Sequence, residues 1–243
     1  RRAEDVAWAV SRAFYIAKSG RPGPVVLDFA KNAQTGMVEY EPASVGFIRS
    51  YNPYPEIKKA AVVEAAKMIN DSVKPFALLG QGVELGGASD EVKELLEKAQ
   101  IPFGTTFLGL SDMPSDHPLN MGILGMHGNL GPNVMTNQCD LLIAIGMRFD
   151  DRVTGNLATY AKQAKIIHFD IDASEFNKNV KIDLAIHGDC KASIPAVTEL
   201  VSEAKHDAWI ASFKPYAEKE YNKVINKAIN PTKGPLLMGE VVR

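Results

Sequence analysis

Two arginines and two aspartates stand within five residues of one another, directly after a continuous apolar run. The run covers residues 141–145 and carries no charge, which is typical of a strand buried on both faces of a parallel sheet. The charged residues that follow it, between two glycines, are Arg148, Asp150, Asp151 and Arg152. A guanidinium donates two parallel hydrogen bonds to phosphate, and open parallel sheets bind ligands at the carboxyl ends of their strands. The segment is therefore a candidate phosphate site, and the alternative is a solvated, self-neutralising charge cluster.

Two other loops contain glycines that let a ligand approach the backbone. Gly80-Gln81-Gly82 follows the strand-like run at 75–79, and its N–H groups can reach a phosphate, although such turns are often only turns. His127 lies among glycines in a loop before a helix, so a functional and a structural role are equally open. Met126 beside it suits the flat surface of a ring.

Three more strand ends carry residues able to contact a ligand. Thr106 closes a strand at 102–107, where exposed backbone can line a ligand or the strand can simply end. Asp170 ends a strand at 165–170, and Gly188-Asp189 ends another at 184–188. A carboxylate in such a place can accept hydrogen bonds from ribose or adenine. Loops of this kind after five strands indicate a long ligand, so a dinucleotide fits better than a mononucleotide.

Strand-like and helix-like patterns alternate along most of the chain. This alternation predicts an α/β fold with a doubly wound, Rossmann-like parallel sheet of about six strands flanked by helices. The expected strands cover residues 25–29, 75–80, 102–107, 141–145, 165–170 and 184–188. The expected helices cover residues 3–18, 55–71, 89–99, 131–138, about 190–201 and 206–229, and a loop is expected from 108 to 131. Residues 32–54 are rich in turn formers, which predicts a linker and a domain boundary.

The composition is that of an ordinary globular protein. The 243 residues are 46% hydrophobic and 23% charged, with a net charge of −2, so neither a nucleic-acid partner nor a membrane span is indicated. Cys139 and Cys190 form no metal-binding pattern and are expected to be buried thiols in a reducing compartment. Both ends of the chain fall inside helical patterns, from which a piece of a longer polypeptide is expected.

Four segments carry a resemblance to a known family. Residues 146–155 (GMRFDDRVTG) are the most specific, supported by residues 19–25 (SGRPGPV), 124–128 (LGMHG) and 168–172 (HFDID). In these segments the chain resembles the large catalytic subunits of the acetolactate synthase (acetohydroxyacid synthase) family, which use thiamine diphosphate. The chain departs from the family pattern at Gln81, where glycine is frequent, and at Asn129, where threonine is common.

The resemblance implies a division of the chain into parts of a three-domain enzyme. Residues 1–35 would be the tail, or remnant, of a preceding domain that binds the thiamine pyrimidine, and residues 36–54 a linker. Residues 55–205 would be a central FAD-binding domain, residues 206–233 a helical connection and residues 234–243 the start of the diphosphate-binding domain. The glutamate that activates thiamine and the motif that binds Mg²⁺ would lie outside this chain, so no catalytic residue is expected within it and the chain alone is expected to be inactive.

The resemblance also implies which residues contact FAD. They are Arg21, Gly80, Gln81, Gly82, Thr106, Phe107, Leu108, Leu124, Gly125, Met126, His127, Gly146, Met147, Arg148, Asp150, Arg152, Val153, Asp170, Ile171, Gly188 and Asp189. Arg152 would also face the substrate channel. No metal ligand is expected among them.

The implied enzyme is a transferase of branched-chain amino acid biosynthesis. It would decarboxylate pyruvate and join the product to pyruvate or 2-oxobutyrate, and it would use thiamine diphosphate and Mg²⁺ besides FAD. Its partners would be the 2-ketoacid substrates, further catalytic subunits in a homodimer or tetramer, and a regulatory small subunit; a bacterial source would imply a cytoplasmic location. Two alternatives remain: the middle domain of another thiamine diphosphate decarboxylase or carboligase, and a non-catalytic nucleotide-binding module.

Overall fold

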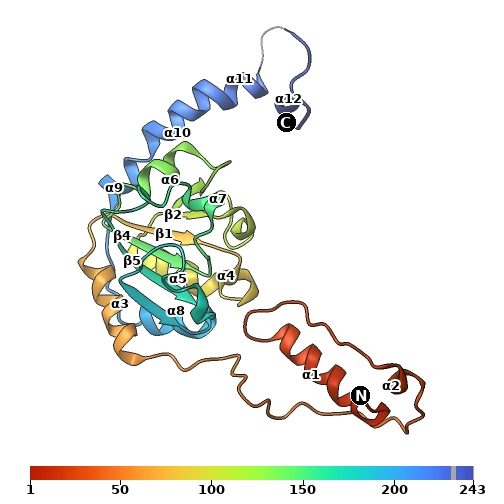
Figure 1. Ribbon diagram of the computed structural model, residues 1–243. Helices are drawn as coiled ribbons and strands as arrows, with labels where there is room; N and C mark the ends of the chain where they lie inside the picture. Colours follow the sequence, from red (N-terminus) through yellow and green to blue (C-terminus); the bar gives the residue numbers. More distant parts are fainter. Residues whose placement is uncertain (231–233, 243) are drawn as a thin grey trace. The chain divides into compact units, whose positions relative to one another are not determined.

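The chain forms two compact units, described here from a computed structural model that covers residues 1–230 and 234–242. The first unit is Arg1–Glu56 and the second begins at Ile57 (Figure 1). The first contains a 3-10 turn at Ala3–Asp5, helix α1 (Val6–Lys18) and the short helix α2 (Lys31–Thr35). Tyr51 ties its returning segment to α1, because its hydroxyl lies 2.9 Å from Ser19 Oγ and donates to the Ser19 carbonyl at 3.0 Å.

The strand expected at residues 25–29 is wrong. The segment is extended but pairs with no other described strand, and Val26 is 90% exposed. A β-branched, apolar run indicates a strand only when a neighbouring strand can accept its backbone hydrogen bonds.

The second unit contains a six-stranded sheet in which every adjacent pair is parallel. The strands are β1 (Pro75–Leu79), β2 (Phe103–Thr105), β3 (Asn120–Ile123), β4 (Leu141–Ile145), β5 (Lys165–Asp170) and β6 (Leu184–His187). Their spatial order is β3-β2-β1-β4-β5-β6. This order confirms the predicted doubly wound α/β fold.

Helices and short turns connect the strands and continue beyond the sheet. They are α3 (Lys59–Asp71), α4 (Gly82–Leu85), α5 (Ser89–Ala99), η2 (Phe107–Gly109), α6 (Leu130–Met135), α7 (Asp151–Thr154), η3 (Ala173–Glu175), α8 (Cys190–Thr198), α9 (Asp207–Ala211), α10 (Lys214–Glu220), the π-helical η4 (Tyr221–Ile225), α11 (Asn226–Ile229) and α12 (Met238–Val242).

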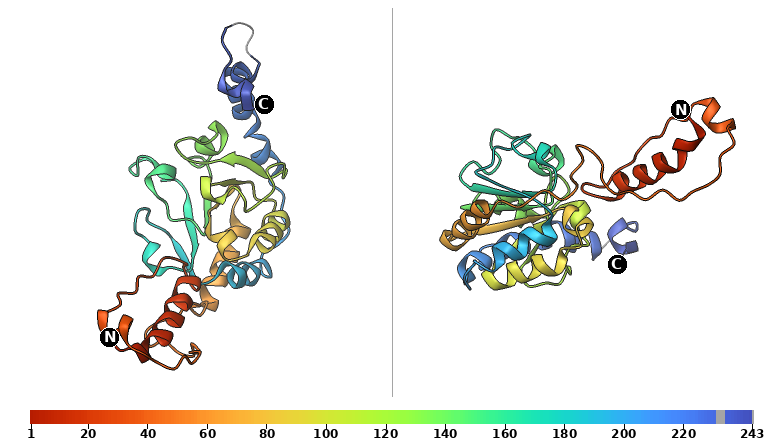
Figure 2. Two further views of the ribbon diagram at one scale, coloured as in Figure 1. Left: turned by 90° about the vertical axis from the view of Figure 1, so that its right-hand side faces the viewer. Right: turned by 90° about the horizontal axis from the view of Figure 1, so that it is seen from below.

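The sheet is buried on both faces, as its uninterrupted apolar strands predict. Alternate residues of β4 enter different cores: Ile143 belongs to the cluster with side chains from α3, α5 and α8, whereas Leu142 belongs to the cluster with side chains from α6 and α9. Helices α5 and α8 lie side by side on one face of the sheet (Figure 2). Trp209 of α9 fixes the second layer, because its Nε1 donates to the Pro75 carbonyl at 2.8 Å. Because all six strands are parallel, their carboxyl ends lie at the same edge of the sheet.

Two further expectations need correction. The loop expected at 108–131 contains edge strand β3, whose Asn120 and Gly122 are poor strand formers and whose pairing with β2 is irregular. The single helix expected at 206–229 is divided, because Pro215 starts a new helix at α10 and lacks the N–H that would continue the previous one. The expected connection at 206–233 is described as far as Asn230, and residues 231–233 and 243 lie outside the described part of the chain.

Candidate functional site

The strand order reverses between β1 and β4, and the loops after these two strands meet there. Gly82 N donates to the Gly146 carbonyl at 2.9 Å, and Gly80 N donates to the Ile145 carbonyl at 3.0 Å. A Cβ on Gly82 would lie 2.6 Å from Gly146 Cα, and Gly146 itself has φ +60°. Glycine is therefore required for this backbone-to-backbone contact. A reversal of this kind is where doubly wound sheets bind nucleotides.

The segment after β4 alternates between buried and exposed side chains. Met147 and Phe149 are 5% and 2% exposed, whereas the side chain of Arg148 between them is 59% exposed. Phe149 has φ +50°, an uncommon conformation for a non-glycine residue, and its ring packs edge-on against Tyr160 and His168. The buried neighbours direct Arg148 outward from the end of the strand.

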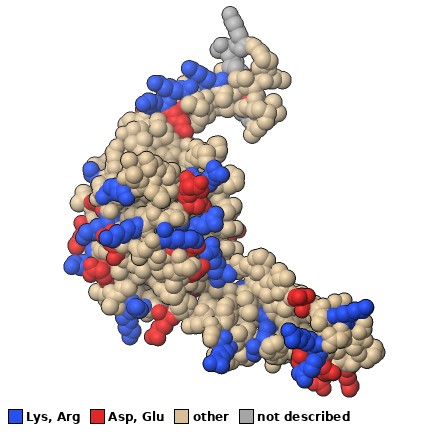
Figure 3. Space-filling view, in the orientation of Figure 1, with Lys and Arg blue, Asp and Glu red and all other residues tan. Residues whose placement is uncertain are grey.

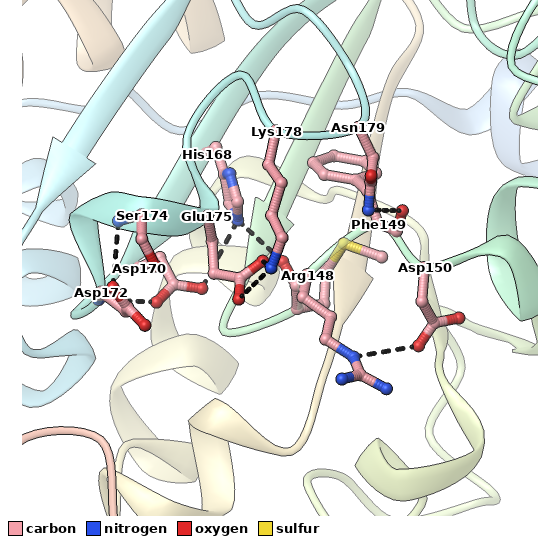
Figure 4. Close-up of polar contacts among 11 residues, drawn as sticks. Arg148, Phe149, Asp150, His168, Asp170, Asp172, Ser174, Glu175, Lys178 and Asn179 are labelled. Carbon is pink, nitrogen blue, oxygen red and sulfur yellow. Dashed lines mark hydrogen bonds and ion pairs between the residues drawn. The ribbon is translucent and has the colours of Figure 1, made fainter.

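Asp150 has a structural role in this segment. Its Oδ1 accepts from Arg152 N at 3.0 Å and caps α7, while its Oδ2 accepts from Arg148 Nε at 3.2 Å (Figure 4). The ion pair is exposed, and exposed pairs contribute at most about 1 kcal/mol. It therefore leaves Arg148 able to turn toward an anionic ligand.

The loop after β3 packs against the turn that contains Arg152. Met126 N donates to the Arg152 carbonyl at 2.8 Å, and Asn133 holds Gly125 through two hydrogen bonds of 2.9 Å. Gly125 has φ +99°, and a Cβ there would lie 2.4 Å from the Arg152 oxygen. Leu124 is buried and Val153 half-buried, whereas Met126 and His127 are exposed. Loops from two strands that are not neighbours in the sheet are thus joined.

Exposed apolar side chains accompany the charged ones at this edge. Phe107 is 73% exposed and Leu108 is 59% exposed, directly after Thr106, whose N–H donates to the Leu79 carbonyl at 2.8 Å. With Met126, they provide exposed apolar surface in the loops that follow β2 and β3.

The acidic residues after β5 and β6 are already engaged with backbone groups. Asp170 is only 9% exposed, and its Oδ1 accepts from Asp172 N at 2.8 Å. Asp189 caps α8 by accepting from Lys191 N at 2.9 Å. Ile171 is half-buried and Gly188 is buried. These residues lie at the expected edge, but the structure gives their carboxylates local structural partners.

Arg21 lies in the first unit, outside the group that the sheet brings together. All the other expected contact residues lie at the carboxyl ends of the strands or in the loops and short helices that follow them. The thiols of Cys139 and Cys190 are buried and unpaired, and burial raises the pKa of each to about 12, so neither is a nucleophile.

Three side chains near this edge were not predicted from the sequence. Asp112 is 2% exposed; its Oδ1 accepts from Glu84 N at 3.2 Å, its Oδ2 has no hydrogen-bond partner, and burial raises its pKa to about 7. His168 contacts the Met147 carbonyl at 2.7 Å, and Asn179 Nδ2 donates to the Phe149 carbonyl at 3.0 Å. These partners are 21 to 30 residues apart in sequence, a separation at which local patterns carry no signal.

Within residues 1–230 and 234–242, no group of three or more His, Cys, Asp or Glu side chains could hold a metal ion. Over the same residues, every helix is too short or too polar to cross a bilayer.

Comparison with known families assigns the fold to a class of enzymes. Residues 62–197 match the family described as thiamine pyrophosphate enzyme, central domain, so the chain belongs to that family. The matched region contains all six strands and every loop of the carboxyl edge.

Among the relatives, acetolactate synthase large subunits recur. The chain is 44% identical over 195 residues to a probable acetolactate synthase large subunit of Methanocaldococcus jannaschii, covering 79% of the chain and 33% of the relative. It is 38% identical over 225 residues to the acetolactate synthase large subunit of Parasynechococcus marenigrum, covering 88% and 36%. It is 35% identical over 243 residues to that of Buchnera aphidicola subsp. Schizaphis graminum, covering 96% and 42%. The chain thus spans about a third to two fifths of the length of these relatives.

Proposed function

We propose that this chain is the FAD-binding central part of an acetolactate synthase large subunit. The observation that carries the proposal is the carboxyl edge of the sheet, where two glycine loops meet at the strand-order reversal beside the exposed Arg148. The relatives named acetolactate synthase support the choice of enzyme.

The residues of the edge fit the two chemical halves of FAD. The turns that contain Gly82 and Gly146 pack against each other without room for a side chain, while Arg148 and Arg152 offer positive charge to the diphosphate. Phe107, Leu108 and Met126 offer exposed apolar surface to a ring. In this proposal FAD does no net redox work and shapes one wall of the substrate channel, which Arg152 borders.

The proposed whole enzyme joins two 2-ketoacids. Thiamine diphosphate, bound with Mg²⁺ elsewhere in the enzyme, supplies the electron sink for decarboxylation of pyruvate. The part played by this chain is to bind and orient: its loops hold FAD and exclude water from one side of the channel. We further propose catalytic dimers or tetramers, and a regulatory small subunit as partner. The domain limits at residues 35, 54, 205 and 233 and the FAD contacts of the other edge residues, Arg21 included, belong to the same proposal.

The binding of FAD by the purified chain tests the proposal. Equilibrium dialysis against FAD, with ADP and FMN as matched ligands, should give saturable binding of FAD that exceeds binding of either smaller nucleotide. Preferred binding of ADP would favour the middle domain of a different thiamine diphosphate enzyme. Absence of binding by all three would contradict the proposed site.

A second measurement concerns catalysis. With pyruvate, thiamine diphosphate and Mg²⁺ added, the 243-residue chain should form no acetolactate, because the proposal places the glutamate that activates thiamine and the Mg²⁺ motif outside it. Turnover by the purified chain would contradict that placement.

A further inference from the structure

We propose that His168 is a positioning residue, whose imidazole fixes the backbone of the Arg148 segment for binding of the FAD diphosphate. The inference rests on the proposed function and adds to it a residue that does not touch the ligand. His168 lies on β5, is 0% exposed, and points toward the segment after β4 (Figure 4). Its Nε2 lies 2.7 Å from the Met147 carbonyl oxygen, one residue before Arg148.

The geometry selects one tautomer of the imidazole. A carbonyl oxygen can only accept, so the short contact requires a hydrogen on Nε2. The other nitrogen, Nδ1, is buried and has no hydrogen-bond partner, so a hydrogen placed there would be an unsatisfied buried donor. The nearest carboxylate oxygen, Asp170 Oδ2, lies 3.6 Å from Nε2, beyond hydrogen-bond distance. The Nε2–H tautomer is therefore the form that the site holds.

The ring cannot turn away from this contact. Phe149 packs edge-on against it with centroids 5.1 Å apart, and Phe176 packs edge-on from another direction at 5.2 Å. Phe149 belongs to the segment being positioned, so the same imidazole holds that segment through a hydrogen bond and a ring contact. The position of Arg148 between the two held residues makes its direction depend on His168.

Other donors fix the carbonyls on either side of the Met147 carbonyl. Gly82 N donates to the Gly146 carbonyl and Asn179 Nδ2 donates to the Phe149 carbonyl. The segment therefore follows one backbone path before a ligand arrives, and preorganisation of this kind increases affinity by reducing the ordering cost on binding. His168 is the fully buried side-chain donor among these groups.

Three variants of the chain test the inference by FAD titration. His168→Leu removes the donor and should weaken FAD binding about tenfold, the loss expected for one hydrogen bond. His168→Gln places an amide N–H in reach of the same carbonyl and should restore binding to within about threefold of the parent. A merely structural core residue would not show this rescue.

Trp209→Phe is the matched control. It also removes a buried ring N–H that donates to a carbonyl, that of Pro75, in the same core layer but at the amino end of β1. It should lower stability while leaving FAD affinity unchanged. Equal weakening by Trp209→Phe and His168→Leu, or failure of His168→Gln to restore binding, would overturn the inference.

A ligand-free measurement separates the inference from the proposed function. Long-range ¹⁵N–¹H NMR of the chain should show His168 with its hydrogen on Nε2 and a bare Nδ1; a hydrogen on Nδ1 alone would contradict the Met147 contact. If the parent chain binds no FAD, the proposed function fails and the positioning role fails with it. If the parent binds FAD and the His168 variants bind it equally well, only the inference fails.

Discussion

In the proposed site, Arg148 is the residue from which we expect the largest contribution to phosphate binding. Its buried neighbours Met147 and Phe149 direct it outward, and its only described ion pair, with Asp150, is exposed and weak. Guanidinium–phosphate contacts are charge-assisted and bidentate, so they are worth more than the pair they replace.

Replacement of Arg148 tests this contact. Arg148→Ala should weaken FAD binding by about 1.5–3 kcal/mol, through loss of one charge-assisted phosphate contact. Lys165→Ala removes an exposed positive charge at the amino end of β5 and should change affinity little, which isolates the local contact from net charge. Equal FAD titrations for Arg148→Ala and the parent would remove Arg148 from the site.

Asp112 makes the stability of this edge depend on pH. Its pKa is raised to about 7 by burial, against about 3.9 in an unfolded chain. Because the folded form binds the proton more tightly, protonated Asp112 makes its full contribution to the free energy of unfolding below about pH 4. This contribution falls by about 1.4 kcal/mol per pH unit between the unfolded and the folded pKa, and it is lost as the pH rises through about 7.

Asp112→Asn should abolish this pH dependence. The amide oxygen can still accept from Glu84 N, and no charge has to be buried at high pH. The variant should be more stable than the parent at about pH 8 and lose that advantage toward pH 4, as measured by urea unfolding across pH. Asp116→Asn, at an exposed position of the same loop, is the control. Parallel pH profiles for Asp112→Asn and the parent would contradict the raised pKa.

At the scale of elements, helix α10 supports the loop after β3. Glu220 Oε2 accepts from Leu130 N at 3.1 Å and from Asn129 Nδ2 at 3.3 Å, and Asn129 Oδ1 accepts from Ile123 N at 2.9 Å. Glu220 thus places a carboxylate at the start of α6. Asn129, an expected departure from the family pattern, takes part in this contact.

Removal of the Glu220 carboxylate should weaken the element contact. Glu220→Ala is expected to lower the free energy of unfolding by about 1–2 kcal/mol, a typical loss for a helix cap. Glu218→Ala, on the same helix with a side chain 61% exposed, should change it by less than about 0.5 kcal/mol. Urea unfolding measures both, and equal effects would show that Glu220 contributes only helix propensity.

The elements differ in how well the sequence predicts them, for physical reasons. Residues 141–145 were predicted because burial on both faces demands an unbroken apolar run, which the sequence displays directly. Edge strand β3 was missed because it pairs with one strand only, β2. An edge strand tolerates a poor strand former such as Gly122, so its sequence shows no strand pattern. Residues 25–29 were predicted wrongly because a local pattern does not say whether a partner strand exists.

The candidate site was predictable to the extent that topology fixes it. The rule that ligands bind at carboxyl ends located the loops after β1, β4 and β5 without a structure. The roles of Asp112 and His168 were not predictable, because they depend on contacts with Glu84 and Met147 that only folding brings close. The capping roles of Asp150 and Asp189 were likewise visible only in the structure.

At the scale of the whole molecule, the net charge of the 243 residues is only −2. On the face visible in Figure 3, Lys and Arg side chains are interspersed with Asp and Glu over the sheet domain. In the proposed function, recognition of an anionic dinucleotide therefore depends on a few placed arginines at one edge, and not on a general positive field.

Hydrogen exchange of the chain with and without FAD tests the central claim most directly. The account predicts that FAD slows amide exchange at the carboxyl edge, in residues 80–82, 124–127 and 146–153. Residues 97–101, at the end of α5 near the amino end of β2, should exchange unchanged and serve as the internal control. Unchanged exchange at the carboxyl edge with FAD bound, or protection confined to the opposite edge, would contradict the account.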